Sequence, residues 1–409
     1  MRTLYVSQNG LVENLGQSQV LPYLRGLARH GADIEIVSFE LPGADAGAIE
    51  RLREDLRAAS IGWYPLRRTM GGSLPRKVGE AAQGVLAALG KALRRRPHIV
   101  HGRSYFPTAI CDAVTALSPR SKLLFDCRGM IGDEYVDCGY WQRESLEYRL
   151  VKTYERRLFR RSDGIVVLTR ALRDWLRDGA VVGPRPLLEV VPCCVDMNRF
   201  APDAGARARV REELGLGDRL TLVYAGSLGT WYLEPEMASF ARALRARARA
   251  AGREVAFACF TPSDASSLRR LVEAAGFTSD EIVVRRVAPR DMPAHLAVGD
   301  IGLSFIQSCF SKKGSSPTKV AEYLACGLPV VVNGDIGDQR DLAVETNACI
   351  VLPGFGAADI DQAAQAAFAL ASRPIEERIA AAREVARRHF GLEEVGVSRY
   401  VKLYEALAS

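Results

Sequence analysis

The sequence predicts an α/β protein with two domains, each built on a parallel sheet covered by helices on both faces. Strand-like and helix-like patterns alternate along the chain, which is typical of doubly wound folds. At 409 residues, the chain is also longer than one hydrophobic core usually supports. The alternation is interrupted at Pro192–Gly205, where the sequence is PCCVDMNRFAPDAG, and then restarts. We therefore place a hinge near this segment.

Apolar runs predict the strands of both domains. In the first domain they are Leu4–Ser7, Ile34–Phe39, Trp63–Leu66, His98–His101, Lys122–Asp126, Ile165–Leu168 and Leu188–Val191. In the second they are Thr221–Tyr224, Val255–Phe260, Ile282–Val287, Ile301–Phe305 and Pro329–Val332. Amphipathic spacing predicts a first helix from about Ser18 to Gly31, and further helices at Glu234–Arg249, Ser266–Ala275 and Leu392–Leu407.

The stretch Ser315–Val332 is the most informative, since it reads as a loop, a short helix, a glycine stop and a strand. Ser316 suits an N-cap and Pro317 the first helical position. Free N–H groups at a helix start bind anions, and Lys319 adds a positive charge in the first turn. Glu322 follows one turn deeper. This pattern fits a nucleoside diphosphate, with the lysine at the phosphates and the acid at the ribose.

Lys319 and Glu322 also have the spacing of an ordinary ion pair on a helix surface. The flanking apolar runs favour a ligand site, because they place the helix start at the carboxyl edge of a parallel sheet. Ligands bind at such edges in open α/β folds.

Glycines follow the first strand of each domain. Gly16 lies before the expected first helix, and Gly226 and Gly229 lie in the segment AGSLGTWY after Thr221–Tyr224. Glycine lets the backbone approach a ligand closely, although a plain turn is the alternative. Neither segment has the G-x-G-x-x-G or P-loop pattern. One glycine loop in each domain suggests a ligand held between them.

Charged residues also follow two strands of the first domain. Arg103 comes after one strand, and Asp126, Arg128 and Asp133 come after the next. An arginine at the carboxyl edge of a sheet suits an anionic group, but an acid and an arginine close together can also pair with each other. We expect His101 to be packed rather than catalytic.

Composition limits the remaining classes. No run approaches the length of a membrane span, no signal-peptide core is present, and the nine cysteines have no paired metal spacing, so we expect reduced thiols in a cytoplasmic protein. Residues 1–200 hold 30 Lys and Arg against 22 Asp and Glu, which is a net charge of +8. The whole chain has a net charge of +7, so the positive surplus belongs to the first half. No zinc-finger or RNA-binding signature accompanies this charge, so nucleic acid is not an expected partner.

Basic residues gather around the helical stretch within residues 63–96. They are Arg67, Arg68, Arg76, Lys77, Lys91, Arg94, Arg95 and Arg96. A solvated helix on the sheet is one explanation. The other is a face that rests on an anionic membrane.

The motifs together resemble those of the retaining GT-B glycosyltransferases of family 4. SSPTKVAEYLACGLPVV is similar to the nucleotide-sugar signature of that family, and YAGSLGT, VVLT, VPCCVDMNRF and GQSQVLPYL stand where the family has its landmarks. The resemblance implies two facing Rossmann-like domains. Residues 1–198 would bind the acceptor, residues 199–391 the donor, and a helix within 392–409 would cross back to the first domain.

The resemblance also implies roles for particular residues. Lys319 would hold the donor diphosphate and Glu322 the ribose hydroxyls, while Gly16 would approach the donor from the first domain. The residues expected to act in catalysis are Lys319, Glu322, Asp126 and Arg128. Those expected to bind the donor are Gly16, Gln17, Arg103, Gly226, Ser227, Leu228, Gly229, Lys313, Ser316, Pro317, Thr318, Lys319 and Glu322.

Two positions depart from the family pattern. Gly314 stands where the family often has a glutamate, which leaves the contact to the far hydroxyls of the sugar open. Ser227 and Tyr232 stand where the family often has an arginine and a lysine that support the leaving diphosphate. Lys319, with Lys312 or Lys313, is expected to replace them.

The activity implied is sugar transfer from a nucleoside-diphosphate sugar to an acceptor hydroxyl, with retention and without a metal, in the synthesis of cell-surface polysaccharide or glycoconjugate. The acceptor would be a saccharide or a lipid-linked saccharide, used at the inner face of the membrane. Asp126 or the leaving phosphate would take the acceptor proton. The alternatives are a nucleotide-sugar epimerase of the same architecture and a non-catalytic sugar-binding homologue.

Overall fold

The computed structural model describes residues 1–69, 74–345 and 347–409, which form two compact units. The first unit comprises Met1–Pro192, Lys313–Ser315 and Leu392–Ser409, and the second comprises Cys193–Lys312 and Ser316–Gly391. The boundary placed at residue 198 from the sequence lies just beyond Pro192. Each unit contains one parallel sheet with helices between successive strands, as the alternating pattern predicts.

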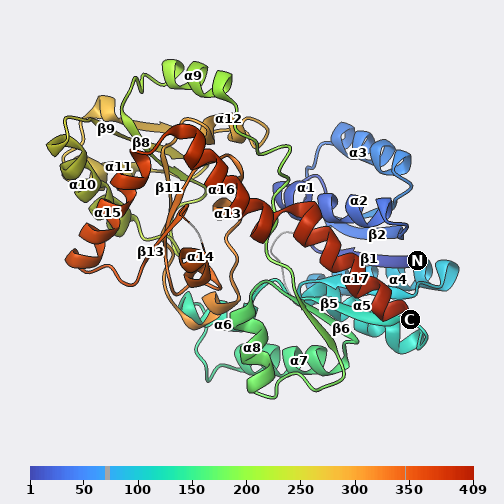
Figure 1. Ribbon diagram of the computed structural model, residues 1–409. Helices are drawn as coiled ribbons and strands as arrows, with labels where there is room; N and C mark the ends of the chain where they lie inside the picture. The colour runs from blue at the N-terminus through green and yellow to red at the C-terminus, as the bar shows by residue number, and fades with distance from the viewer. Residues whose placement is uncertain (70–73, 346) are drawn as a thin grey trace. The chain divides into compact units, whose positions relative to one another are not determined.

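A seven-stranded sheet forms the centre of the first unit, in the order β3-β2-β1-β4-β5-β6-β7. Its strands β1, β2, β5 and β6 are labelled in Figure 1. The strands are β1 (Arg2–Ser7), β2 (Asp33–Glu40), β3 (Gly62–Arg67), β4 (Ile99–Arg103), β5 (Lys122–Asp126), β6 (Gly164–Val167) and β7 (Leu187–Val190). All five residues of β4 are buried, as expected for a strand covered on both faces. The order reverses between β1 and β4, so their carboxyl ends flank the crevice where such sheets bind ligands.

The helices of the first unit connect these strands. They are α1 (Asn14–Gln19), α2 (Leu21–Arg29), α3 (Ala46–Ala58), α4 (Leu74–Arg95), α5 (Tyr105–Leu117), α6 (Ile131–Asp137), α7 (Leu146–Arg161) and α8 (Arg170–Asp178). The first helix predicted from about Ser18 is wrong in its start, because the chain is already helical from Asn14. The backbone breaks at Val20 (φ −122°, ψ −65°), where α1 ends and α2 begins.

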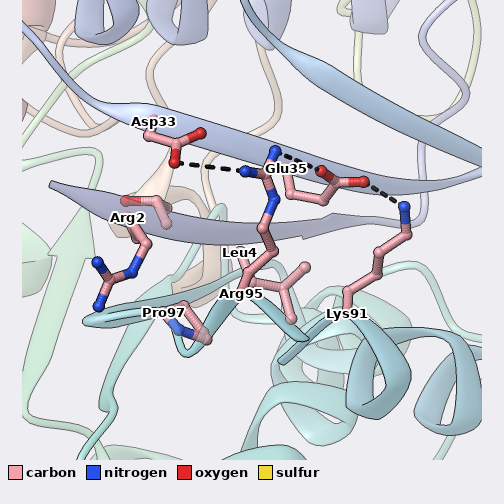
Figure 2. A pocket seen from close by; sticks show the side chains of 8 residues that line it. Arg2, Leu4, Asp33, Glu35, Lys91, Arg95 and Pro97 are labelled. Carbon is pink, nitrogen blue, oxygen red and sulfur yellow. Dashed lines mark hydrogen bonds and ion pairs between the residues drawn. The ribbon is translucent and has the colours of Figure 1, made fainter. Parts of the chain in front are cut away.

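The end of α4 is fixed to the sheet by charge pairs. Lys91 and Arg95 both contact the carboxylate of Glu35 on β2, and Arg95 also lies 3.7 Å from Asp33 (Figure 2). Two members of the predicted basic stretch therefore have a structural role. Residues 70–73 of that stretch lie outside the described residues.

The segment 392–409 belongs to the first unit, which confirms the prediction that the C-terminal helix returns to the first domain. The prediction of one regular helix from Leu392 is wrong in detail, because Leu392–Val397 (η3) is π-helical and α17 (Ser398–Ala408) follows. Tyr404 of α17 lies with its hydroxyl 2.8 Å from Nδ1 of His101 on β4. Both side chains are buried, so His101 is packed, as expected.

The second unit has a six-stranded sheet in the order β10-β9-β8-β11-β12-β13. The strands are β8 (Leu220–Ala225), β9 (Val255–Phe260), β10 (Ile282–Arg285), β11 (Ile301–Ser304), β12 (Val330–Asn333) and β13 (Cys349–Leu352). The sequence analysis missed β13, a four-residue edge strand whose middle two positions are only partly buried. Here the order reverses between β8 and β11, which places the ligand crevice of this unit at their carboxyl ends.

The second unit also contains helices and one 3-10 turn, η1 (Ser279–Glu281). The helices are α9 (Ala204–Glu213), α10 (Glu234–Ala250), α11 (Ser266–Ala274), α12 (Met292–Leu296), α13 (Thr318–Ala325), α14 (Gln339–Glu345), α15 (Ala357–Ala371) and α16 (Ile375–Phe390). A further 3-10 turn, η2 (Phe310–Gly314), spans residues of both units. None of the helices in the described part of the chain has the length and hydrophobicity needed to cross a bilayer.

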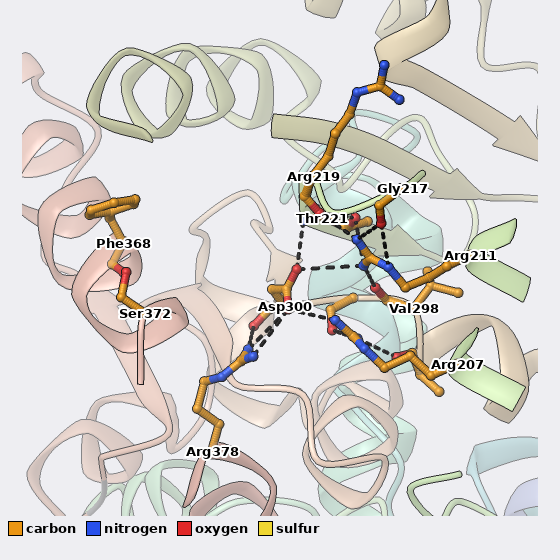
Figure 3. A network of polar contacts seen from close by, with 12 residues as sticks. Arg207, Arg211, Gly217, Arg219, Thr221, Val298, Asp300, Phe368, Ser372 and Arg378 are labelled. Atoms are coloured by element: carbon orange, nitrogen blue, oxygen red, sulfur yellow. Dashed lines mark hydrogen bonds and ion pairs between the residues drawn. The ribbon is translucent and has the colours of Figure 1, made fainter. Parts of the chain in front are cut away.

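A buried carboxylate ties two of these helices to the sheet of the second unit. Asp300, just before β11, accepts hydrogen bonds from Arg207 of α9 at 2.9 Å, from Arg378 of α16 at 3.3 Å and from the backbone N–H of Thr221 at 2.9 Å (Figure 3). Because one acid satisfies several donors, removing it would leave all of them without their partner. The cluster therefore stabilises this side of the unit only while the acid is present.

Candidate active site

Helix α13 carries Lys319 and Glu322 at the carboxyl side of the second unit's sheet. It begins at Thr318, with Pro317 in the N-cap position and no side-chain cap. The prediction that Ser316 is the N-cap is therefore wrong, because the Ser316 hydroxyl instead accepts a hydrogen bond from the N–H of Cys193 at 3.1 Å. The first N–H groups of the helix consequently remain without a side-chain cap.

The side chain of Lys319 points into the protein rather than along the surface. It is only 6% exposed, which excludes the ordinary surface ion pair. Its ammonium group lies 4.0 Å from the ring centroid of Tyr224 and 3.8 Å from that of Tyr232. Among the described residues, Nζ has no hydrogen-bond partner. The charge is thus held by aromatic faces while its three N–H donors remain unused.

The glycine loop after β8 lies directly against this ammonium group. Gly226 has φ +125°, and a side chain there would lie 3.0 Å from Nζ of Lys319. Gly229 also has a positive φ, +94°. Tyr323, on α13, accepts a hydrogen bond from the N–H of Ala225 at 2.6 Å. Helix and loop are therefore fixed together, and the absence of a side chain at Gly226 leaves the ammonium group open on that side.

The other predicted loop residues lie beside these glycines. Ser227 is exposed and its carbonyl accepts a hydrogen bond from the Tyr224 hydroxyl. Leu228 is partly buried and its N–H donates to Ser263 at 3.0 Å. One short loop at the start of the segment that leads to α10 thus contains Gly226, Ser227, Leu228 and Gly229.

Burial changes the protonation of both charged residues on α13. Burial lowers the pKa of Lys319 to about 7, and the charge of Glu322 only partly opposes this shift. Burial also raises the pKa of Glu322 to about 7, against the effects of Arg199 and Lys319. Near neutral pH each group is therefore present in both protonation states, and an anion beside Lys319 would favour its charged form.

The lysines of the segment before α13 differ in position. Lys312 is buried, and its ammonium lies 3.5 Å from the ring centroid of Trp231 in the same unit. Lys313 is exposed and belongs to the first unit. A side chain at Gly314, where the family often has a glutamate, would come within 2.9 Å of Leu172. The glycine at this departure from the family pattern is thus closely packed.

In the first unit, Arg103 and Asp126 are brought together at the ends of β4 and β5. The two residues are paired in the sheet register, and Nη1 of Arg103 lies 3.1 Å from Oδ2 of Asp126. Arg128 lies 3.4 Å from the other carboxylate oxygen. Burial alone would raise the pKa of Asp126, but Arg128, His101 and Arg103 outweigh it and hold the pKa well below its usual range. Asp126 is therefore an ionised partner of two arginines.

Gly16 lies inside α1 rather than in the loop before a helix. A side chain at Gly16 would come within 2.1 Å of the carbonyl oxygen of Gly10, so glycine is needed for the chain to fold back on itself. Gln17 supports the same turn, since its amide donates to the carbonyl of Leu11 at 2.7 Å. The carboxylate of Glu40 accepts the N–H of Leu11 at 2.8 Å. These contacts order the loop after β1.

The sequence reasoning did not identify the aromatic faces around Lys319. Tyr232 drew attention only because it replaces a cation of the family pattern, and Tyr224 gave no signal beyond an apolar strand. Asp133, noted in the sequence, pairs with Lys152 at 2.8 Å. Within the described residues, no group of three or more His, Cys, Asp or Glu side chains is placed to hold a metal ion.

Comparison with known proteins extends these observations. Residues 16–194 match the family model of glycosyl transferase 4-like domains. This part of the chain, which includes GQSQVLPYL and VVLT, is therefore similar to glycosyl transferase 4-like domains. This match confirms the resemblance stated from the motifs.

Curated relatives include a GDP-mannose-dependent alpha-(1-6)-phosphatidylinositol monomannoside mannosyltransferase of Mycolicibacterium smegmatis. It is 30% identical over 250 residues, which cover 60% of this chain and 61% of the relative. A protein of the same name from Mycobacterium tuberculosis is 26% identical over 183 residues, covering 44% of this chain and 46% of the relative. The chain therefore spans about three fifths or less of the length of these relatives.

Solved structures match over nearly the whole chain. HepE of Anabaena, in complex with UDP and glucose, has a TM-score of 0.70 at 13% identity, covering 99% of this chain and 100% of that one. Sucrose-phosphate synthase of Thermosynechococcus elongatus has a TM-score of 0.67 at 13% identity, covering 99% of this chain and 98% of that one. With its two Rossmann-like sheets and the returning C-terminal segment, the chain has the GT-B fold, as predicted.

Proposed function

We propose that the protein is a retaining glycosyltransferase that moves a hexose from a nucleoside-diphosphate sugar to the hydroxyl of a glycolipid or saccharide. The observation that carries this proposal is the buried ammonium of Lys319, which has no hydrogen-bond partner among the described residues and faces a glycine loop. A buried cation with unused donors is costly unless a ligand supplies an anion. The glycosyl transferase 4-like domain makes a sugar donor's diphosphate the appropriate anion.

The donor would be held by residues of the second unit. Lys319 and the N–H groups of the first two helical residues, Thr318 and Lys319, bind the diphosphate, and Glu322 binds the ribose hydroxyls one turn deeper. The loop Gly226–Gly229 approaches the phosphates with its backbone. Ser316, Pro317 and Thr318 shape the turn that presents these N–H groups.

Catalysis would come mainly from stabilising charge on the leaving diphosphate. As the bond to the anomeric carbon breaks, negative charge grows on the phosphate oxygens, and Lys319 is placed to neutralise it. Asp126 is ionised but already paired with Arg103 and Arg128, which favours the leaving phosphate as the acceptor of the proton. Arg103 and Arg128 would then attract an anionic group of the acceptor. Gly16, Gln17 and Lys313 complete the proposed contacts from the first unit.

The names of the relatives support GDP-mannose as the donor and a phosphoinositide-based glycolipid as the acceptor. A lipid acceptor requires contact with a membrane surface. On α4, the side chains of Val78, Leu86 and Leu93 are 58%, 70% and 66% exposed and share one helical face. The exposed Arg94 and Arg96 follow them. This combination suits an anionic membrane surface, and we propose that the protein works there on the cytoplasmic side.

Thermal unfolding with GDP, UDP, ADP, dTDP and CMP tests the donor site. A nucleotide at 100 times its dissociation constant should stabilise the protein by about 2.7 kcal/mol, and GDP should give the largest shift. Lys319→Ala should abolish the shift, whereas Arg242→Ala, which changes an exposed residue of α10, should preserve it. A full shift in Lys319→Ala would contradict the phosphate assignment.

Product analysis separates the alternatives. A transferase should consume GDP-mannose faster when a phosphoinositide mannoside is added and should form an α-linked product. An epimerase would convert a nucleotide sugar without any acceptor. A non-catalytic homologue would bind the nucleotide and leave every donor intact.

A further inference from the structure

The first unit contains an apolar cavity of about 420 Å³ that none of the roles described above uses. It is lined by Gln8, Ser104, Tyr105, Phe106, Ala109, Ile131, Tyr135, Trp141, Leu150, Val151 and Tyr154. Gln8 follows β1 and Ser104 follows β4, so the cavity opens at the point where the strand order reverses. Sheets of this kind bind their ligands at that point.

The walls of this cavity are held in place by contacts behind them. The Tyr105 hydroxyl donates to Glu155 at 2.6 Å, so the polar end of this side chain is satisfied away from the cavity. The rings of Tyr135 and Trp141 lie 4.4 Å apart, and Phe106 packs on Phe39 at 5.6 Å. The cavity is therefore preformed, and its surface is apolar although several of its residues are tyrosines.

The mouth of the cavity is also apolar. Leu150 is 60% exposed and Tyr135 is 40% exposed. Two large apolar side chains that line the cavity are therefore also in contact with solvent. An extended apolar group that enters between them would cover both, and exposed apolar patches of this kind mark binding sites.

A positively charged face of α7 begins about a quarter turn around the helix from Leu150, the cavity-lining position nearest to it. Arg149, Arg156 and Arg160 are exposed, share one side of the helix by their spacing and have no carboxylate partner among the described residues. Arg157 and Arg161, in contrast, pair with Asp112 of α5. A ligand with an apolar chain and an anionic head matches both the cavity and this charge.

We propose that this cavity binds one acyl chain of an anionic lipid acceptor and that the arginines of α7 attract its head group. This inference rests on the proposed transferase function and names the acceptor as a lipid whose chain is inserted into the protein. Sheet edge, apolar walls and basic helix face all belong to the first unit.

The test compares ligands that differ only in the chain. Binding of lysophosphatidylinositol, below its micelle concentration, is measured by calorimetry against glycerophosphoinositol, which has the same head group without the chain. We expect the chain to increase affinity at least tenfold. Lysophosphatidylcholine, with the chain but no net charge, should bind several-fold more weakly than lysophosphatidylinositol. Equal binding with and without the chain would overturn the proposal, and equal binding of the two lysolipids would overturn its anionic part.

Matched variants locate the binding site. Ala109→Phe fills the cavity and should remove the gain from the chain, whereas Ala116→Phe, at an exposed position of the same helix, should keep it. Leu150→Gln should weaken chain binding severalfold, whereas Leu146→Gln, at a similarly exposed leucine outside the cavity, should not. Because Leu150 is largely exposed, its variant should fold even if Ala109→Phe does not. Chain binding that survives both cavity variants would contradict the assignment.

The GDP shift measured in the same samples distinguishes the two proposals. If the wild-type protein shows the GDP shift but gains no affinity from the acyl chain, only the proposal for the cavity is contradicted. A missing GDP shift with normal chain binding would contradict the donor site and leave the lipid site standing.

Discussion

The ammonium group of Lys319 lies 3.8 Å from the ring centroid of Tyr232, so a buried cation lies against the face of an aromatic ring. Such contacts contribute about 0.5–2 kcal/mol. Tyr232 occupies a position where the family pattern often has a second cation. The ring therefore supports the remaining lysine instead of adding charge of its own.

Tyr232→Leu should weaken GDP binding about three- to tenfold, which corresponds to the cation–π contribution. The variant removes the ring face and makes protonated Lys319 less favourable. Tyr232→Phe keeps the ring and should bind GDP like the wild type. Isothermal titration at pH 7 provides the measurement, and equal affinities for the Leu and Phe variants would exclude this role of the ring.

Nucleotide affinity should depend on the protonation of Lys319. Since its pKa is about 7 in the free protein, the ammonium form decreases above neutrality, and binding must then take up a proton. We expect the dissociation constant for GDP to be about tenfold higher at pH 8.5 than at pH 6.5. Lys319→Arg keeps its charge over this range. If the wild type and this variant show the same pH profile, Lys319 does not titrate in binding.

Lys319→Met should stabilise the protein when no nucleotide is present. The folded-state pKa of about 7 lies below the usual value of 10.5, so the unfolded chain binds more protons between these values. The destabilisation from Lys319 is therefore complete below pH 7 and disappears as the pH rises towards 10.5. We expect a gain of about 1–4 kcal/mol in the free energy of unfolding at pH 6, and a smaller gain at pH 9. Urea unfolding at both values tests this, and a loss of stability at pH 6 would contradict it.

Asp300→Asn should destabilise the second unit by about 3–5 kcal/mol, because it leaves buried arginines without a counter-charge. Arg378 is only 8% exposed in its side chain, so solvent can replace little of the lost contact. Asp218→Asn, at an exposed acid of the same unit, serves as the control and should stay within about 0.5 kcal/mol. Denaturant unfolding should show the loss as a lower midpoint for the second unit. A change below 1 kcal/mol would mean that water reaches the cluster.

Local patterns were sufficient to predict most of the fold. Apolar runs identified twelve of the thirteen strands found in the described residues, and Gly327, at φ +78°, ends α13 as the sequence indicated. The short edge strand β13 was missed because it has too few buried positions. The start of the first helix was misplaced because Gly16 suggested a loop, whereas its role is to let the chain pass close to Gly10.

Only those parts of the candidate site that are formed by residues close together in the sequence could be predicted. The spacing of Lys319 and Glu322 indicated a ligand-binding helix. The contact of Lys319 with Tyr224 depends instead on how α13 packs against β8, which no local pattern encodes. Arg103 and Asp126 lie side by side because β4 and β5 are neighbours in the sheet. The apolar cavity combines residues from four separate segments, so nothing in the sequence indicated it.

The position of Tyr404 against His101 affects how the protein is made. His101 emerges from the ribosome about three hundred residues before the helix that covers it. Until residues 392–409 are synthesised, the side of the first sheet that α17 covers stays open to water, while the second unit can already close its own core. We conclude that the domain translated first is the one completed last, and a nascent chain halted near residue 390 should expose that sheet to chaperones.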